Sequence, residues 1–210
     1  MFKDRIEAGN LLATQLSKYK SDQGLVFAIP KGGVPLAYVV AKELGFPMEI
    51  VFTKKIGHPN NKEYAIGAAS LNDYFVIPHY DVSEEYIQEE LKVVREKLRN
   101  MQDKFLDDHK PEILDGKTVI IVDDGMATGN TVLSTINLIK KKNPAKIIVA
   151  IPVASQSAVQ MVTKEADEVI VLKTPPDFSG VGVYYENFND VSEQEVLLYL
   201  EKLRELKMLH

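Results

Sequence analysis

The sequence contains no cysteine, so neither disulfide bonds nor thiol chemistry contribute to its fold or function. It also lacks an apolar run approaching the roughly 18 residues that a membrane-spanning helix needs. Its first residues are mostly charged, and they lead into a helical pattern instead of the apolar core of a secretion signal. These absences predict a cytoplasmic protein that has no membrane partner.

The sequence also has no excess of basic residues. The net charge is −5, which argues against broad binding to nucleic acid, where a basic surface is expected. Any site for an anion must therefore be local. There is no internal repeat, and 210 residues are enough for one domain with a sizeable core. We therefore expect a single domain over residues 1–210.

Helical and strand patterns alternate along the chain. Five apolar stretches have the pattern of β-strands, at residues 25–30, 48–53, 118–122, 146–153 and 168–172. This alternation predicts an α/β fold with a central parallel sheet and helices on both faces. A capping-box pattern at residues 192–195 predicts a final helix that closes over the core.

A long helical pattern lies between the second and third predicted strands. Its apolar residues recur at steps of three and four: Ile87, Leu91, Val94, Leu98, Met101 and Phe105. A stripe of this kind is typical of core packing or a subunit contact, not of a ligand surface. The opposite, charged face, which includes Lys92, Glu96 and Lys97, is expected to be solvated.

The most informative segment is residues 119–131, where two carboxylates follow a strand of four aliphatic residues. Such a run suits a central parallel strand that is buried on both faces, with Asp123 and Asp124 at its carboxyl end. Small and hydroxyl-bearing residues come next, before a helical pattern over residues 131–142. Backbone N–H groups converge at such a helix start and favour a phosphate dianion. The alternative is an ordinary strand-ending turn, for which Asp and Gly are common.

This segment resembles, over all thirteen positions, the motif that binds 5-phosphoribosyl-1-pyrophosphate (PRPP) in the type I phosphoribosyltransferases. The resemblance implies that Asp123 and Asp124 accept hydrogen bonds from the 2′ and 3′ hydroxyls of the ribose. The residues that would surround the 5′-phosphate are Gly125, Met126, Ala127, Thr128, Gly129, Asn130 and Thr131. Ionised carboxylates only accept hydrogen bonds, and they would stabilise positive charge that develops on the ribose.

A second segment, residues 25–33, is another apolar run, which ends at Lys31, Gly32 and Gly33 and opens a helical pattern. It resembles the pyrophosphate loop of the same enzymes. Glycines let the backbone approach an anion closely, and the lysine adds a positive charge. By the resemblance we expect a non-proline cis peptide after Pro30 or Lys31. The alternative is a plain turn with a solvated lysine.

A third segment, residues 52–67, is a long polar stretch that follows the second predicted strand. In the related enzymes a flexible loop closes here and excludes water from the reacting ribose, so we expect a flexible lid at about residues 54–67. Lys54 and Lys55 stand where basic residues would meet pyrophosphate, although a solvated charge pair is the alternative. His58 is expected at the surface and not in catalysis.

The whole chain resembles a group of bacterial and archaeal type I phosphoribosyltransferases whose acceptor is undefined. Recurring phrases of that group lie at residues 27–35, 62–68, 122–129, 150–154 and 184–188.

This resemblance implies a homodimer that transfers 5-phosphoribose from PRPP to a base, as in purine or pyrimidine salvage. The catalytic residues that it implies are Lys31, Lys54, Asp123 and Asp124. Mg²⁺ would bridge oxygens of the pyrophosphate and the ribose, and it would be held mainly by ligand and water, with Asp123 and Asp124 as its protein ligands.

The acceptor is less clearly indicated. Enzymes for 6-oxopurines usually carry an acidic residue at the position of Ala127 and a lysine near residues 153–156, which here are Val-Ala-Ser-Gln. Hypoxanthine and guanine are therefore disfavoured, and Ala127 resembles the adenine and orotate types more closely. Residues 174–190 could form a hood in which Phe178 and Tyr184 stack on a base, or these rings could pack against the terminal helix.

Two other functions stay open. A regulatory protein that binds PRPP or a nucleotide could keep the phosphate loop without turnover, although the retention of Lys31, the lid and both acidic residues favours an enzyme. A dinucleotide-dependent dehydrogenase is disfavoured, since the first strand-turn-helix unit lacks a full G-x-G-x-x-G motif.

Overall fold

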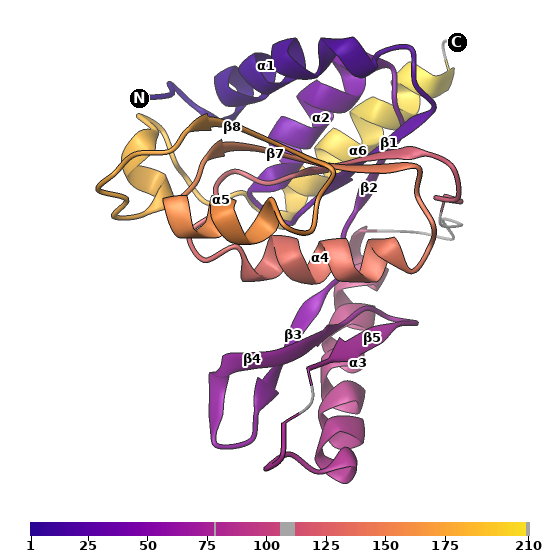
Figure 1. The fold of residues 1–210 in the computed structure, drawn as a ribbon. Helices are drawn as coiled ribbons and strands as arrows, with labels where there is room; N and C mark the ends of the chain where they lie inside the picture. The colour runs from indigo at the N-terminus through magenta and orange to yellow at the C-terminus, as the bar shows by residue number, and fades with distance from the viewer. Residues whose placement is uncertain (78, 106–111, 209–210) are drawn as a thin grey trace.

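The computed structural model describes residues 1–77, 79–105 and 112–208. Within these ranges the main sheet has five parallel strands in the order β2-β1-β6-β7-β8 (Figure 1). Its strands are β1 (Gly24–Ala28), β2 (Met48–Ile50), β6 (Thr118–Val122), β7 (Lys146–Val153) and β8 (Glu168–Lys173). The predicted α/β fold and the five predicted strands are confirmed, although β1 and β2 end earlier than expected, at Ala28 and Ile50.

Helices cover both faces of this sheet. One face carries α1 (Arg5–Leu16), α2 (Gly33–Leu44) and α6 (Glu193–Met208), and the other carries α4 (Asn130–Lys140) and α5 (Gln156–Val162) (Figure 1). Two short 3-10 helices, η1 (Ser17–Tyr19) and η2 (Val181–Tyr184), follow α1 and precede α6.

The predicted capping box is present at the start of α6. Ser192 N–H donates to Glu195 Oε2 at 2.8 Å, and Glu195 N–H donates to Ser192 Oγ at 3.2 Å. This reciprocal pair satisfies two N–H groups that the helix itself leaves without acceptors. The helix then buries Val196, Leu200 and Leu203 in the main core.

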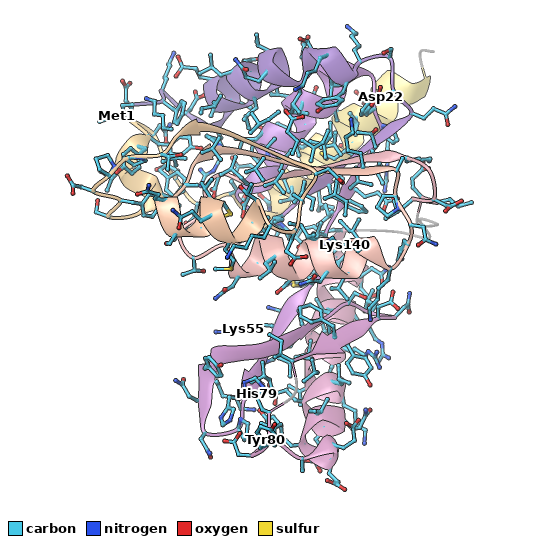
Figure 2. The ribbon with its side chains drawn as sticks, in the orientation of Figure 1. Met1, Asp22, Lys55, His79, Tyr80 and Lys140 are labelled. Atoms are coloured by element: carbon cyan, nitrogen blue, oxygen red, sulfur yellow. The ribbon has the colours of Figure 1, made fainter. Side chains whose placement is uncertain are left out.

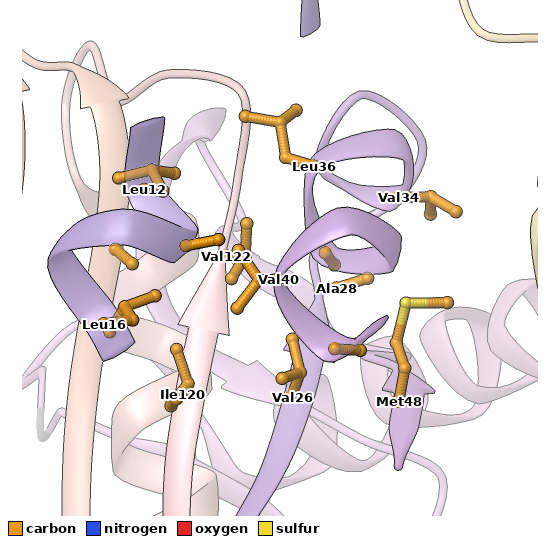
Figure 3. Close-up of a cluster of buried hydrophobic side chains, with 14 of the residues drawn as sticks. Leu12, Leu16, Val26, Ala28, Val34, Leu36, Val40, Met48, Ile120 and Val122 are labelled. Carbon is orange, nitrogen blue, oxygen red and sulfur yellow. The ribbon is translucent and has the colours of Figure 1, made fainter. Parts of the chain in front are cut away.

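Side chains of β1 and β6 alternate between the two faces of the sheet, as extended strands require. Val26 and Ile120 lie on the side of α1 and α2, in one cluster with Leu12 and Val40 (Figure 3). The next residue along β6, Ile121, belongs to the cluster on the other face. Because both faces are filled with apolar side chains, polar chemistry is confined to the loops at the ends of the strands.

A smaller unit projects from the main body on the side of α4 (Figure 1). It consists of an antiparallel sheet, β3 (Lys54–His58), β4 (Asn61–Ala69) and β5 (Tyr74–Val76), packed on the long helix α3 (Glu84–Phe105). Its apolar side chains, among them Ile56, Ile66 and Leu98, form a cluster of their own.

The polar stretch that was predicted as a loop is therefore a β-hairpin, and this is a correction. Isolated apolar residues such as Ile56 and Ile66 give a weak strand signal, but they are enough to cover the apolar stripe of α3. That stripe is buried at Ile87, Leu91, Val94, Leu98 and Phe105, so its predicted packing role is confirmed. Movement of the hairpin as a lid stays a prediction.

His58 is only 9% exposed, so the expectation that it lies at the surface was wrong. Its Nε2 lies 3.0 Å from Asp81 Oδ2, and its Nδ1 accepts a hydrogen bond from Asn60 N–H at 3.2 Å. Both ring nitrogens are thus engaged near the hairpin turn, which fits a structural role. None of the helices in the described ranges is long and apolar enough to cross a membrane.

Candidate functional site

Asp123 and Asp124 follow the last residue of β6, in the middle of the sheet between β1 and β7. Both are half-buried, and Asp124 N–H donates to Asp123 Oδ1 at 2.8 Å. Burial raises the pKa of Asp123 well above its usual range, and the neighbouring Asp124 carboxylate raises it further. Burial also raises the pKa of Asp124, against an opposing effect of Arg5. Two poorly solvated carboxylates side by side favour hydroxyl donors or a cation as partners.

Hydrogen bonds to residues at the end of β7 fix the path of the loop that follows the acidic pair. Met126 N–H donates to the carbonyl of Val153 at 2.9 Å, and its own carbonyl accepts from Ser155 N–H at 3.0 Å. Ser155 Oγ also donates to the carbonyl of Ala127 at 2.6 Å. Gly129 then adopts a φ of 77° at the N-cap of α4, in the left-handed region that favours glycine. The first N–H groups of α4 lack helical acceptors, so this loop can bind an anion.

The glycine-rich loop before α2 lies directly against the acidic pair. A Cβ at Gly32 would fall 1.9 Å from Asp124 Oδ2, and a Cβ at Gly33 would fall 2.9 Å from Asp123 Cα. Side chains at these two positions would displace the carboxylates or the loop, so glycine is required here. The predicted pyrophosphate loop and the acidic pair therefore share one edge of the sheet.

The same loop contains the predicted non-proline cis peptide, which lies between Pro30 and Lys31 and is thereby confirmed. Lys31 is exposed, so its ammonium group is accessible to an anion at this edge of the sheet. Gly33 N–H donates to the carbonyl of Ile29 at 3.0 Å and fixes the start of α2.

A cleft of about 640 Å³ separates the small unit from the start of α4. Lysines of β3, β4 and α3 and polar residues of α4 line it, namely Lys54, Lys55, Lys62, Lys97, Asn130, Thr131 and Ser134. Figure 2 shows Lys55 between the two units. Lys62 has partners within the small unit, since its Nζ lies 2.5 Å from Glu90 Oε2 and 2.6 Å from Tyr86 Oη. The cleft is positively charged and suits an anion.

The predicted site residues lie in two neighbouring regions of the structure. Lys54, Lys55, Asn130 and Thr131 line the cleft, whereas Lys31 and the acidic pair lie outside its lining. The loop at 125–131 joins the two places along the chain.

The position of Lys97 in this cleft was not expected from the sequence. Its side chain is exposed, as expected for the charged face of α3, but it also lines the cleft opposite α4. The helical period shows which side of α3 is apolar, yet it does not show what the charged side faces.

Residues 174–190, the predicted hood, contact the loop after β6. Gly125 leaves room for Val181, whose Cγ1 would lie 2.2 Å from a Cβ at position 125. Tyr185 Oη donates to the backbone carbonyl of Asp124 at 2.6 Å. Burial raises the pKa of this phenol, and the Asp124 carboxylate raises it further, so Tyr185 stays a neutral donor.

The rings of Phe178 and Tyr184 stack on each other, with centroids 5.9 Å apart and planes inclined by 19°. Both are half-buried and pack against the main core cluster. Part of each ring therefore serves packing, while the exposed part is available to a flat ligand.

Arg5, at the start of α1, also contacts the acidic pair and was not singled out from the sequence. Its Nε and Nη2 donate to Asp124 Oδ2 at 2.9 and 2.8 Å. The two residues are 119 positions apart, and no local pattern links them.

The acidic pair offers the oxygen ligands that Mg²⁺ prefers. Within the described residues there is no group of three or more His, Cys, Asp or Glu side chains that could hold a metal ion by themselves. The donor set therefore fits a Mg²⁺ ion that takes most of its ligands from phosphates and water.

Comparison with known proteins extends these observations. A family model described as the phosphoribosyl transferase domain matches residues 3–187. A protein of Mycobacterium tuberculosis with the provisional name phosphoribosyl transferase Rv0571c is 32% identical over 209 residues, which cover 96% of this chain and 47% of that protein. The chain thus spans about half the length of the curated relatives that it matches.

Among solved structures, protein TT1426 from Thermus thermophilus is 32% identical with a TM-score of 0.90, over 97% of this chain and 99% of that one. A protein from Neisseria gonorrhoeae solved with bound ppGpp shares the fold, with 15% identity and a TM-score of 0.50 over 96% and 98% of the two chains. The family match includes the glycine-rich loop, the acidic pair and the loop that follows it. The chain therefore belongs to the phosphoribosyl transferase domain family and has the type I phosphoribosyltransferase fold.

Proposed function

We propose that this chain transfers the 5-phosphoribosyl group from PRPP to a nitrogenous base and releases pyrophosphate. The observation that carries this proposal is the close approach of Gly32 to Asp124, which joins a glycine-rich loop to a carboxylate pair at one edge of the sheet. PRPP has the complementary chemistry, since its ribose hydroxyls are donors and its two phosphate-bearing ends are anions. Membership of the family supports the same reaction.

In this proposal each part of the site binds one part of PRPP. Asp123 and Asp124 accept hydrogen bonds from the ribose hydroxyls, residues 125–131 surround the 5′-phosphate, and residues 31–33 face the pyrophosphate. The bond between C1 of the ribose and the pyrophosphate oxygen breaks while a nitrogen of the base forms a bond to C1, and the proton of that nitrogen passes to water or to the released pyrophosphate. Positive charge increases on the ribose ring during this step, and the two carboxylates stabilise it.

Lys54 and Lys55 extend the site from the small unit, which we propose to be the lid. Closure of the cleft toward α4 would bring their ammonium groups to the pyrophosphate and exclude water from C1. Asp123 and Asp124 would help to hold Mg²⁺, which would supply positive charge to the departing pyrophosphate.

The acceptor is a base that needs no carboxylate at position 127, which argues against hypoxanthine and guanine. Ala127 is exposed and its carbonyl is occupied by Ser155 Oγ, so neither residue supplies an ionised base at this position. Phe178 and Tyr184 are our candidates for stacking on the acceptor. Adenine and orotate are the first acceptors to test.

The decisive experiment is Mg²⁺-dependent release of pyrophosphate from PRPP with a panel of purine and pyrimidine bases. It is run on the parent, on a double variant Asp123→Asn, Asp124→Asn, and on Asp103→Asn, an exposed carboxylate of α3 that serves as the matched control. Release with one base in the parent and the control, but not in the double variant, supports the proposal and identifies the acceptor.

Two other outcomes separate the alternatives. PRPP binding by calorimetry without release for any base would replace the transferase proposal with a regulatory PRPP-binding protein. Absence of PRPP binding to the parent would overturn the phosphoribosyl proposal itself. We also propose a homodimer of single-domain subunits, which light scattering tests, and a monomeric mass would contradict it.

A further inference from the structure

We propose that Arg5 is a positioning residue that holds the Asp124 carboxylate in the orientation required for the ribose. This inference rests on the proposed function, because it assigns a task to Arg5 in the same PRPP site. It adds a residue from α1 to a site whose other predicted members lie in the loops after β1 and β6, in β3 and at the starts of α2 and α4.

The contact between Arg5 and Asp124 is specific in its geometry. Nε and Nη2 donate to the same oxygen, Oδ2, at 2.9 and 2.8 Å, so two N–H groups of a rigid guanidinium fix one end of the carboxylate. Both side chains are largely shielded, with 11% and 15% of their surface exposed. A shielded, charge-assisted pair of this kind is stronger than a surface ion pair and tolerates few alternative side-chain positions.

Asp124 Oδ2 is also confined by Gly32. The Cβ position of that glycine lies 1.9 Å from Oδ2 and 2.5 Å from Asp124 Cγ. The carboxylate is thus fixed by hydrogen bonds from Arg5 and fits closely against the backbone of the pyrophosphate loop. A rotation of Asp124 would require movement of Arg5 or of this loop, so the guanidinium and the loop together define its position.

Arg5 is itself held by the hood. Its Nη1 donates to the carbonyl of Asn189 at 2.7 Å, and its Cζ lies 4.0 Å from the centroid of the Phe188 ring. Tyr185 of the same segment donates to the carbonyl of Asp124. The hood therefore reaches Asp124 by two routes, one through the backbone and one through the guanidinium.

The residues before Arg5 connect to the same segment. Phe2 N–H donates to the carbonyl of Tyr184 at 2.7 Å, and Glu186 N–H donates to the carbonyl of Phe2 at 2.8 Å. The residues that precede α1 are therefore hydrogen-bonded to the hood. These bonds fix the position of Arg5 beside the acidic pair.

The test compares Arg5→Lys with the parent and with Arg99→Lys, an exposed arginine of α3. Lysine keeps the charge but cannot donate from two fixed N–H groups to one oxygen while also reaching Asn189. We expect Arg5→Lys to lower kcat by about 10- to 100-fold, with KM for PRPP changed less than about threefold, because misplacement of a reacting group acts on the catalytic step. Arg99→Lys should match the parent.

Three results would overturn the proposal. Full activity of Arg5→Lys would show that charge alone suffices. A fall in KM for PRPP would show that Arg5 competes with the ribose for Asp124. A fall in melting temperature with unchanged kcat would show a purely structural role.

Crystal structures of the parent and of Arg5→Lys without ligand provide a readout that does not depend on turnover. A displaced Asp124 carboxylate in the variant is expected, and an unchanged one would overturn the positioning role. If the parent itself releases no pyrophosphate with any base, the proposed transferase function fails, while the crystallographic comparison still decides whether Arg5 positions Asp124.

Discussion

Gly32 lies in direct contact with the carboxylate of Asp124, so close that a methyl group at position 32 would overlap Oδ2. The two residues come from different strand-loop-helix units, one after β1 and one after β6, and these strands are neighbours in the sheet. The contact couples the proposed pyrophosphate loop to the proposed ribose site.

Gly32→Ala should therefore disable the site. The new Cβ displaces either the loop or Asp124, and we expect at least about a tenfold loss in kcat/KM for PRPP. Gly116→Ala is the control, because Gly116 has a φ of 70° and open space around it. That variant should lose about 1 to 2 kcal/mol of stability from backbone strain and keep its activity. Equal activity of Gly32→Ala and the parent would contradict the assignment of the loop.

Lys97→Gln should weaken PRPP binding. Lys97 lines the cleft and makes no hydrogen bond or ion pair with any described residue, so its charge is available to an anion. We expect KM for PRPP to rise about 2- to 10-fold, with a smaller difference at high salt, where exposed charges are screened. Lys92→Gln on the same helix lies outside the cleft lining and should leave KM unchanged. Identical effects of the two variants would remove Lys97 from the site.

The parts of the fold that could be predicted are those in which local sequence and packing agree. Residues 118–122 and 146–153 form strands where their aliphatic runs indicate, because both faces of a central parallel strand are buried. The hairpin at residues 54–69 could not be predicted in this way. Its strands carry few apolar residues, and they depend on the stripe of α3, which lies later in the chain.

The candidate site also contains residues that the sequence predicts and residues that it does not. The acidic pair, the proposed phosphate loop and the glycine-rich loop follow strands and are visible as local motifs. Arg5 and Lys97 are not, because their positions depend on how α1 and α3 pack against segments far away in the sequence. Single charged residues on helices occur throughout this chain, so residue type alone does not distinguish them.

Phe178→Leu should raise KM for the acceptor and leave KM for PRPP unchanged. Leucine retains apolar packing, but it removes the flat face that we propose for stacking, which is worth about 1 kcal/mol and corresponds to roughly a fivefold change. The measurement is steady-state kinetics with the acceptor found in the base panel. A loss of stability with both KM values unchanged would assign the ring to packing alone.

Leu98→Ala should destabilise the small unit. Leu98 is fully buried in the cluster between α3 and the hairpin, so the substitution leaves a cavity and should cost about 2 to 5 kcal/mol. Leu197→Ala on α6 is the control, because Leu197 is 44% exposed and its loss should cost less than about 1 kcal/mol. Urea unfolding measures both free energies. If α3 holds the hairpin in place, hydrogen exchange in β3 and β4 should also increase in Leu98→Ala.

Asp123→Asn should stabilise the protein at neutral pH while it abolishes transfer. Burial raises the pKa of Asp123 above its unfolded value, so its contribution to stability is full below the unfolded pKa and is lost as pH rises through the folded pKa. Asparagine has no charge to bury and keeps an oxygen that can accept from Asp124 N–H. The free energy of unfolding of the variant should therefore exceed that of the parent by on the order of 1 kcal/mol near pH 7.

The difference between Asp123→Asn and the parent should shrink as the pH falls and become smallest below about pH 3, where Asp123 is protonated in both the folded and the unfolded parent. Urea unfolding in EDTA across this pH range measures this difference in the free energy of unfolding without a contribution from bound metal. Asp103→Asn should show no comparable trend, because Asp103 is exposed. A difference that grows toward acid would mean that the folded protein favours the ionised form of Asp123. In that case the fold would stabilise the ionised carboxylate of Asp123. The acidic pair would then not be a destabilising feature that is retained for ligand binding.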